Sequence, residues 1–151
     1  MQSETLKQKN KVMETIQIKS IYGEILFECE KENNTIKDTI EEAVREGVSL
    51  FEADLSYADL CGASLRKADL RGANFRASDL RGVNLSCTDL SGANLYGADL
   101  SGANLYKANI RNANICKANL CGAYIYGADL RGANISKENL LYANLCGVKL
   151  S

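Results

Sequence analysis

From Val48 onwards, an apolar residue returns at every fifth position without an insertion or a deletion, from Leu50 to Leu150. Two residues before most of these apolar centres stands a small residue, usually Ala, and one residue before stands Asp or Asn. A five-residue period fits neither an α-helix, with about 3.6 residues per turn, nor a flat strand, with a period of two. The chain must therefore turn once in every unit.

The turn is expected in the two residues that follow each centre. Within a unit, extended backbone points the small residue and the apolar centre to one side and the Asp or Asn to the other. Glycine stands in the second corner position of ten units. A type II turn needs a positive φ there, which glycine adopts without steric cost. We expect a different type of corner where another residue takes this position, as at Lys67, Ala77, Lys107 and Lys117.

The run of A-(D/N)-L-x-x units resembles the pentapeptide-repeat family, and its twenty-one in-phase units cover about two thirds of the chain. The resemblance implies a right-handed β-helix of square cross-section with four units per coil, so that residues twenty apart stack. On this basis residues 48–151 form an all-β solenoid, a right-handed quadrilateral β-helix of about five coils. Successive coils are expected to stack at roughly 4.8 Å.

The residues before the repeat predict an N-terminal cap. Residues 1–14 are polar and charged, and we interpret them as a flexible tail. In residues 15–47, two alternating apolar runs around Tyr22 and Gly23 predict a β-hairpin. Thr35 with Asp38 resembles a capping box, and the apolar stripe behind it predicts an α-helix over residues 36–46.

Gly47 stands where a left-handed residue is expected to end this helix. We expect the hairpin and helix to form a lid over the first coil, because the end of a solenoid otherwise exposes apolar side chains and an unpaired strand edge. The alternative is that residues 15–47 are an independent binding module.

The repeat weakens at its C-terminal end. Glu138 takes a position that Ala holds in most units, and an inward carboxylate is costly unless it reaches solvent or a partner. Either the last coil frays or a second subunit completes it. We expect an end-to-end homodimer through this coil. Its candidate contact residues are Leu141, Tyr142, Leu145 and Leu150.

Two outward columns are candidate interaction surfaces if residues twenty apart stack. The first consists of Arg71, Arg111 and Arg131, which follow the aspartate column of Asp69, Asp89 and Asp129. It is either a contact stripe or the means of neutralising like charges stacked at roughly 4.8 Å. The second consists of Tyr106 and Tyr126, with Tyr124 nearby. It either anchors a partner or stiffens the stack.

The composition argues against catalysis. The chain has no His, so a Ser-His-Asp or Cys-His pair is excluded. Cys116 and Cys121 fall on adjacent faces, unlike the close cysteine pairs of zinc sites, and every repeat glycine is a corner rather than part of a phosphate loop. We therefore expect no enzyme activity, no metal and no cofactor.

The chain also lacks the signs of a membrane or secreted protein. No apolar run approaches the length of about 18 residues that a membrane-spanning helix needs, and the N-terminus shows no apolar signal region. Five of the six cysteines fall in outward corner positions, and exposed thiols suit a reducing compartment. We expect a cytoplasmic bacterial protein.

The expected function is a rigid scaffold for protein–protein interaction with an unknown protein partner. The resemblance implies an alternative, because some pentapeptide-repeat proteins inhibit or protect DNA gyrase by imitating duplex DNA. Such mimicry needs a strongly acidic surface, whereas residues 48–151 carry eleven Lys and Arg residues against nine Asp and Glu residues. Direct nucleic-acid binding is also disfavoured, because its candidates surround one coil instead of forming a patch. These candidates are Arg66, Arg71, Arg76 and Arg81.

Overall fold

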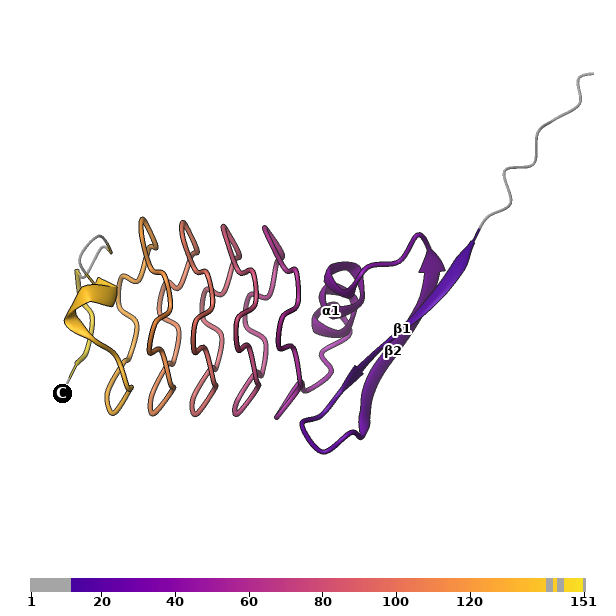
Figure 1. Ribbon diagram of the computed structural model, residues 1–151, viewed down its shortest axis with the longest axis horizontal. Coiled ribbons are helices and arrows are strands. Elements are labelled where there is room, and N and C mark those ends of the chain that lie inside the picture. The colour runs from indigo at the N-terminus through magenta and orange to yellow at the C-terminus, as the bar shows by residue number, and fades with distance from the viewer. Residues whose placement is uncertain (1–11, 141–142, 144–145, 151) are drawn as a thin grey trace, which may run out of the picture.

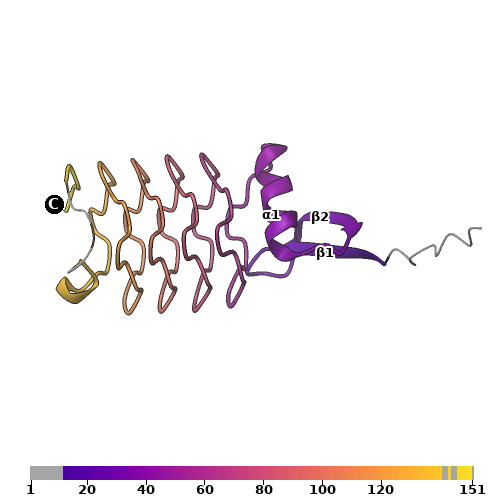
Figure 2. The same cartoon turned by 90° about the horizontal axis from the view of Figure 1, so that it is seen from above.

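The protein is a stack of coils closed at its N-terminal end by a hairpin and a helix (Figures 1 and 2). The computed structural model describes residues 12–140, 143 and 146–150. Its elements are β1 (Met13–Lys19), β2 (Ile25–Glu32), α1 (Ile36–Arg45) and a short 3₁₀ helix, η1 (Lys137–Leu140). The coils lie between α1 and η1.

Residues twenty apart stack along the coils. One continuous series of parallel bridges joins Asp54, Asn74, Asn94, Asn114 and Asn134. Backbone hydrogen bonds follow the same spacing: the Leu55 N–H donates to the Asn74 carbonyl at 2.8 Å. The spacing confirms four five-residue units per coil.

The apolar centres fill the interior of the coils. Every centre from Leu50 to Leu130 is buried, with Phe75 the largest among them, and most of the preceding alanines are buried as well. The sequence-based expectation of a shared interior is therefore confirmed over this stretch. It fails at the end of the chain, where Ile135 and Leu140 are only partly buried and Leu150 is 52% exposed.

The second corner residue has a positive φ in every unit from Glu52 to Gly132, and the prediction of a different corner at Lys67, Ala77, Lys107 and Lys117 is wrong. Lys67, Ala77, Lys107 and Lys117 have φ values of 63°, 53°, 54° and 60°, close to the glycine values. The cause is the ladder on either side: the Lys67 N–H donates to the Ser86 carbonyl at 3.1 Å, and this bond requires the same backbone path in each coil. Neighbouring coils thus impose a left-handed conformation that costs an L-residue roughly 1 kcal/mol or more.

The hairpin and α1 are present as predicted. β1 and β2 pair in antiparallel register, with Ile18 opposite Phe27 and Ile16 opposite Cys29. β1 begins at Met13, so the last two residues of the predicted tail belong to the hairpin, while residues 1–11 lie outside the described part. Thr35 caps α1 by accepting the Asp38 N–H at 3.0 Å.

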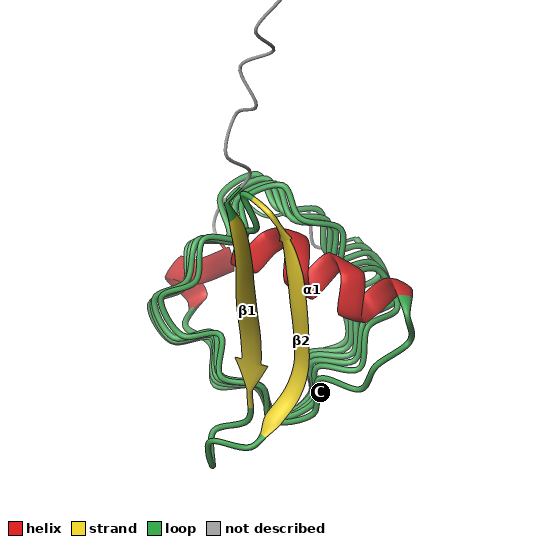
Figure 3. Ribbon diagram, turned by 90° about the vertical axis from the view of Figure 1, so that its right-hand side faces the viewer, coloured by secondary structure: helices red, strands yellow, loops and turns green. Residues whose placement is uncertain are grey.

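The cap contacts the first coil through both backbone and core. Ser20 forms an antiparallel bridge with Ala53, and the Ile21 N–H donates to the Glu52 carbonyl at 2.8 Å. Ile18 and Ile40 are fully buried in the same apolar cluster as Leu50. α1 lies between the hairpin and the coils in Figures 1 and 3. These contacts cover the end of the solenoid. The division of the chain into a cap, residues 15–47, and a β-helix, residues 48–151, stays a prediction.

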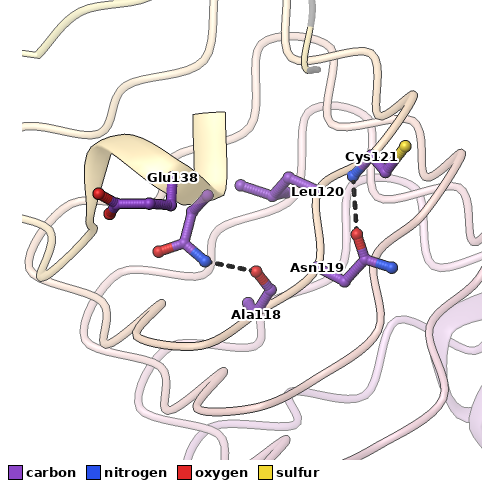
Figure 4. A pocket seen from close by; sticks show the side chains of 6 residues that line it. Ala118, Asn119, Leu120, Cys121 and Glu138 are labelled. Carbon is purple, nitrogen blue, oxygen red and sulfur yellow. Dashed lines mark hydrogen bonds between the residues drawn. The ribbon is translucent and has the colours of Figure 1, made fainter. Parts of the chain in front are cut away.

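The ladder is interrupted at η1. Asn139 does not continue the bridges of the coil below it: its backbone N–H donates to Ser136, and its side-chain Nδ2 donates to the Ala118 carbonyl at 2.5 Å (Figure 4). Glu138 is exposed and points away from Leu120. A hydrogen bond from Ser136 lowers the pKa of Glu138. The chain thus leaves the β-helical path where the sequence would have placed a carboxylate in the interior.

No helix within the described ranges combines the length and the apolar character required to cross a bilayer.

Candidate interaction surface

The outward Asp and Asn side chains hold the faces of the coils together in two ways. Most of them accept a backbone N–H two residues further along, as Asn94 Oδ1 does from Tyr96 at 3.2 Å. On most faces the amide nitrogen also donates to the coil before it. Asn74 donates to Asp54 at 3.0 Å, and Asn94 donates to Asn74 at 3.1 Å. We call the face built on this series the amide face.

The face opposite the amide face is organised differently. We call it the tyrosine face. Its residues 82–86, 102–106 and 122–126 contain no Asp, Glu, Lys or Arg, whereas the equivalent residues 62–66 of the first coil end in Arg66. Asn84 and Asn104 accept the backbone N–H groups of Ser86 and Tyr106. Within the described residues their amide nitrogens donate to no neighbour, unlike those of the amide face. These donors are available to a bound molecule.

Three tyrosines of this face form a cluster. The rings of Tyr106 and Tyr126 have centroids 5.9 Å apart, and Tyr124 lies 6.1 Å from Tyr106 and 6.3 Å from Tyr126. All three ring planes agree within 12°. Tyr124 remains 42% exposed and Tyr126 39% exposed, so the cluster is ordered by stacking without being covered.

Lysine borders this cluster without entering it. The Lys107 ammonium lies 5.0 Å from the centroid of the Tyr106 ring. A hydrogen bond with Tyr106 raises the pKa of Lys107, which therefore stays charged at neutral pH. Lys107 fixes one side of the cluster and marks the edge of the uncharged area.

The arginine column is brought together on one corner, but most of its charge is already paired. Arg71 binds both carboxylate oxygens of Asp69, at 2.7 and 2.9 Å, and Arg131 binds Asp129 in the same way. Hydrogen bonds from these arginines lower the pKa values of Asp69 and Asp129 to about 2. Arg111 is exposed and follows Asn109 instead of Asp, so the described residues give it no paired carboxylate.

The predicted dimer end is described only in part. Leu141, Tyr142 and Leu145 lie outside the described residues, and Leu150 is exposed. A pocket of about 140 Å³ opens between η1 and the coil below it. The backbone N–H groups of Lys117 and Leu120 make no ladder bond to the described residues of the last coil, in contrast to their equivalents in earlier coils.

Sequence reasoning missed one aromatic site. The Tyr96 ring lies between two cations, with the Arg76 guanidinium 5.2 Å and the Lys117 ammonium 5.4 Å from its centroid. The spacing of these residues could have indicated the site, because Arg76 precedes Tyr96 by one coil and Lys117 follows it by one coil and one residue. Among the described residues no group of three His, Cys, Asp or Glu side chains could hold a metal ion.

The family model for pentapeptide repeats matches residues 49–86, 84–120 and 117–151, with eight copies. The chain belongs to the pentapeptide-repeat family. Its fold is that of the family, a right-handed quadrilateral β-helix, here with an N-terminal hairpin and helix. No curated protein resembles the chain closely enough to count as a match.

Several solved structures resemble the chain. A pentapeptide repeat protein from Nostoc PCC 7120, alr5209, is 35% identical over 78% of this chain and 96% of its own, with a TM-score of 0.53. Rfr23 from the cyanobacterium Cyanothece 51142 is 35% identical over 67% of this chain and 62% of its own, with a TM-score of 0.33. QnrB1, a plasmid-mediated fluoroquinolone resistance protein, is 20% identical over 70% of this chain and 65% of its own, with a TM-score of 0.41.

Proposed function

We propose that this pentapeptide-repeat protein is a rigid, non-catalytic scaffold that binds a protein partner through its tyrosine face. The observation that carries the proposal is the partly exposed cluster of Tyr106, Tyr124 and Tyr126 on a part of the face without charged residues, 82–86, 102–106 and 122–126. Tyrosine offers a large contact area at a low cost in side-chain entropy, and Ser, Gly and Asn add adaptable hydrogen bonds. Charged residues are depleted at the centres of protein interfaces.

Rigidity supports the same proposal. The described coils hold every centre from Leu50 to Leu130 in a continuous core, and the three rings are already stacked. A surface ordered before binding loses little conformational entropy on association. The arginine column is a weaker candidate, because Arg71 and Arg131 would have to give up the carboxylates of Asp69 and Asp129.

The test compares two aromatic sites on opposite faces. Wild type, the variant Y106A/Y124A/Y126A and the matched control Tyr96→Ala are immobilised and exposed to proteins of the native host. A protein retained by wild type and control but lost from the triple variant is then produced in pure form, and its affinity for all three is measured. The proposal fails if the purified partner binds the triple variant as tightly as wild type, or if nothing distinguishes the triple variant from the control.

DNA mimicry is the alternative and is not favoured. Residues 48–151 carry an excess of two basic residues, and three of the carboxylates on the described faces are neutralised by Arg71, Arg81 and Arg131. A mimic of DNA presents a dense negative surface instead. A gyrase supercoiling assay that showed inhibition, or protection from a gyrase-directed drug, would replace the scaffold proposal.

We further propose that the C-terminal coil is completed by a second copy in an end-to-end homodimer. The N–H groups of Lys117 and Leu120, which make no ladder bond to the described residues of the last coil, and the exposed Leu150 side chain support this. Light scattering of the full chain should show self-association, and truncation at Asn139 should weaken it. Full-length protein that is monomeric at high concentration would dismiss the dimer.

We also propose a cytoplasmic location, which the cysteines support, because four of the six are exposed. Fractionation of the native host, with the protein recovered in the soluble cytoplasmic fraction, is the expected result.

A further inference from the structure

The cap has a net negative charge, unlike the coils. Residues 12–47 contain nine Asp and Glu residues against four Lys and Arg residues. Three of the acids alternate along β2: Glu28, Glu30 and Glu32 are exposed, whereas Phe27 and Cys29 between them are partly buried. The alternation places the three glutamates on the face of the hairpin opposite α1, and Lys31, on the other face, pairs with Glu42 of α1 at 2.7 Å.

β2 is also an edge strand. The sheet consists of β1 and β2 alone, and Figure 3 shows the two strands side by side with no third strand beside β2 in the described part of the chain. Besides its pairing with β1, the β2 backbone receives a hydrogen bond from the Asn34 amide, which donates to the Cys29 carbonyl at 2.7 Å. An eight-residue edge is long enough to bind an added strand through its backbone.

The chain contains a segment whose charge pattern matches this edge. Lys7, Lys9 and Lys11 alternate just before the hairpin. In an extended strand, residues two apart lie on one side at roughly 6.6 Å, which is also the spacing of the glutamates on β2. Opposite charges that face each other across two strands stabilise the pairing, and like charges oppose it.

The register of the hairpin argues against the same pairing within a single chain. Met13 lies opposite Glu32, so an extension of β1 in the same register carries Lys11 and Lys9 beyond the end of β2. The segment of another molecule has no such constraint.

We propose that residues 7–11 of a second copy add as a strand to the free edge of β2, with their lysines facing Glu28 and Glu30. Two molecules that exchange these segments form a closed, two-fold dimer. This contact is independent of the tyrosine face and of the C-terminal coil.

Charge reversal on each side tests the pairing in the full-length protein. Sedimentation velocity at low salt is carried out on wild type, E28K/E30K, K7E/K9E, and the combined variant with all four changes. Each two-residue variant should lose self-association by about tenfold or more, because two attractive pairs become repulsive, and the combined variant should recover it. An equimolar mixture of the two variants should form heterodimers, since each then offers what the other lacks.

The matched control is E24K/E46K, which changes the charge of the cap equally but lies off the outward face of β2. It should associate like wild type. The proposal would be overturned if wild type and E28K/E30K associated equally, or if wild type were monomeric at low salt. The glutamates would then only prevent other strands from pairing with this edge. A C-terminal dimer would respond to truncation at Asn139 but not to these charge reversals, so the two contacts are distinguishable. A synthetic peptide of residues 1–11 should compete with wild-type association and fail to compete with that of the combined variant.

Discussion

The two ends of the solenoid are covered in different ways. At the N-terminal end, Ser20 pairs with Ala53, and Ile40 of α1 is buried in the same cluster as Leu50. At the other end, η1 leaves the ladder, and a single side-chain amide of Asn139 replaces the backbone donor to Ala118. The apolar side chains that cover the first end are fully buried, whereas those of the last coil are only partly buried. We therefore expect opening of the structure to begin at the C-terminal coil.

The largest effect is expected from removing apolar packing at the cap. Ile40→Ala empties a fully buried position and should lower the free energy of unfolding by about 2 to 5 kcal/mol. The matched change Ile135→Ala, at a partly buried position near η1, should cost less. Chemical denaturation of both variants measures the difference. Equal losses would show that the ends are equally consolidated.

The helix cap is expected to have a smaller effect. Thr35→Ala removes the oxygen that accepts the Asp38 N–H and should lower stability by about 1 kcal/mol. Thr15→Ala, an exposed change on β1, serves as the control. Thermal unfolding followed by circular dichroism provides the measurement. Equal melting temperatures for the two variants would exclude a stabilising role for this cap.

A single polar contact is tested at the opposite end. Asn139→Asp keeps the oxygen that accepts the Ser136 N–H but removes the Nδ2 donor to Ala118. We expect a loss of about 1 kcal/mol or less, confined to the last coil. Hydrogen exchange should become faster for the amides near η1 and stay unchanged in the cap. Unaltered exchange near η1 would show that Asn139 does not close this end.

The smallest difference is expected for the surface ion pairs. Asp69 lies near the cap and Asp129 near η1, yet both have a pKa of about 2, below the ordinary 3.8, because each accepts hydrogen bonds from an arginine. A lowered pKa stabilises the fold above the unfolded value, so this contribution should be lost at both ends as the pH falls from about 4 through about 2. Carbon-detected NMR titration measures both groups, and Arg131→Gln should raise the pKa of Asp129 alone. Different pKa values for Asp69 and Asp129 in wild type would show that the two ion pairs are not equivalent.

Much of the fold follows from the sequence because the repeat combines several signals. The five-residue spacing fixes which side chains face inward, and Thr35 and Gly47 delimit the helix. The number of units per coil came from the family resemblance, since a period of five requires a corner but not a square. Stacking at twenty residues confirmed it.

The errors have a common physical origin. Glycine preference indicates where a positive φ is cheap, but the ladder decides where it is required, and so Lys67 and Ala77 adopt it as well. At the tyrosine face, the column predicted that Tyr106 and Tyr126 would stack. The sequence could not predict the hydrogen bonds of the amides on this face, because these depend on side-chain torsion angles. Among the described residues, Asn84 and Asn104 lack the inter-coil bond that Asn74 and Asn94 make.

Because the corners from Glu52 to Gly132 share one conformation, the number of units before an outward side chain determines the direction in which it points. One unit advances the chain by one side of the square, so the orientation of Tyr126 relative to the hairpin depends on the number of units between them. Inserting or deleting a single unit would swing the tyrosines by a quarter turn about the long axis, whereas a change of four units would alter only their distance from the hairpin. In such an architecture, the angle between two binding sites changes in steps and their separation can be adjusted independently.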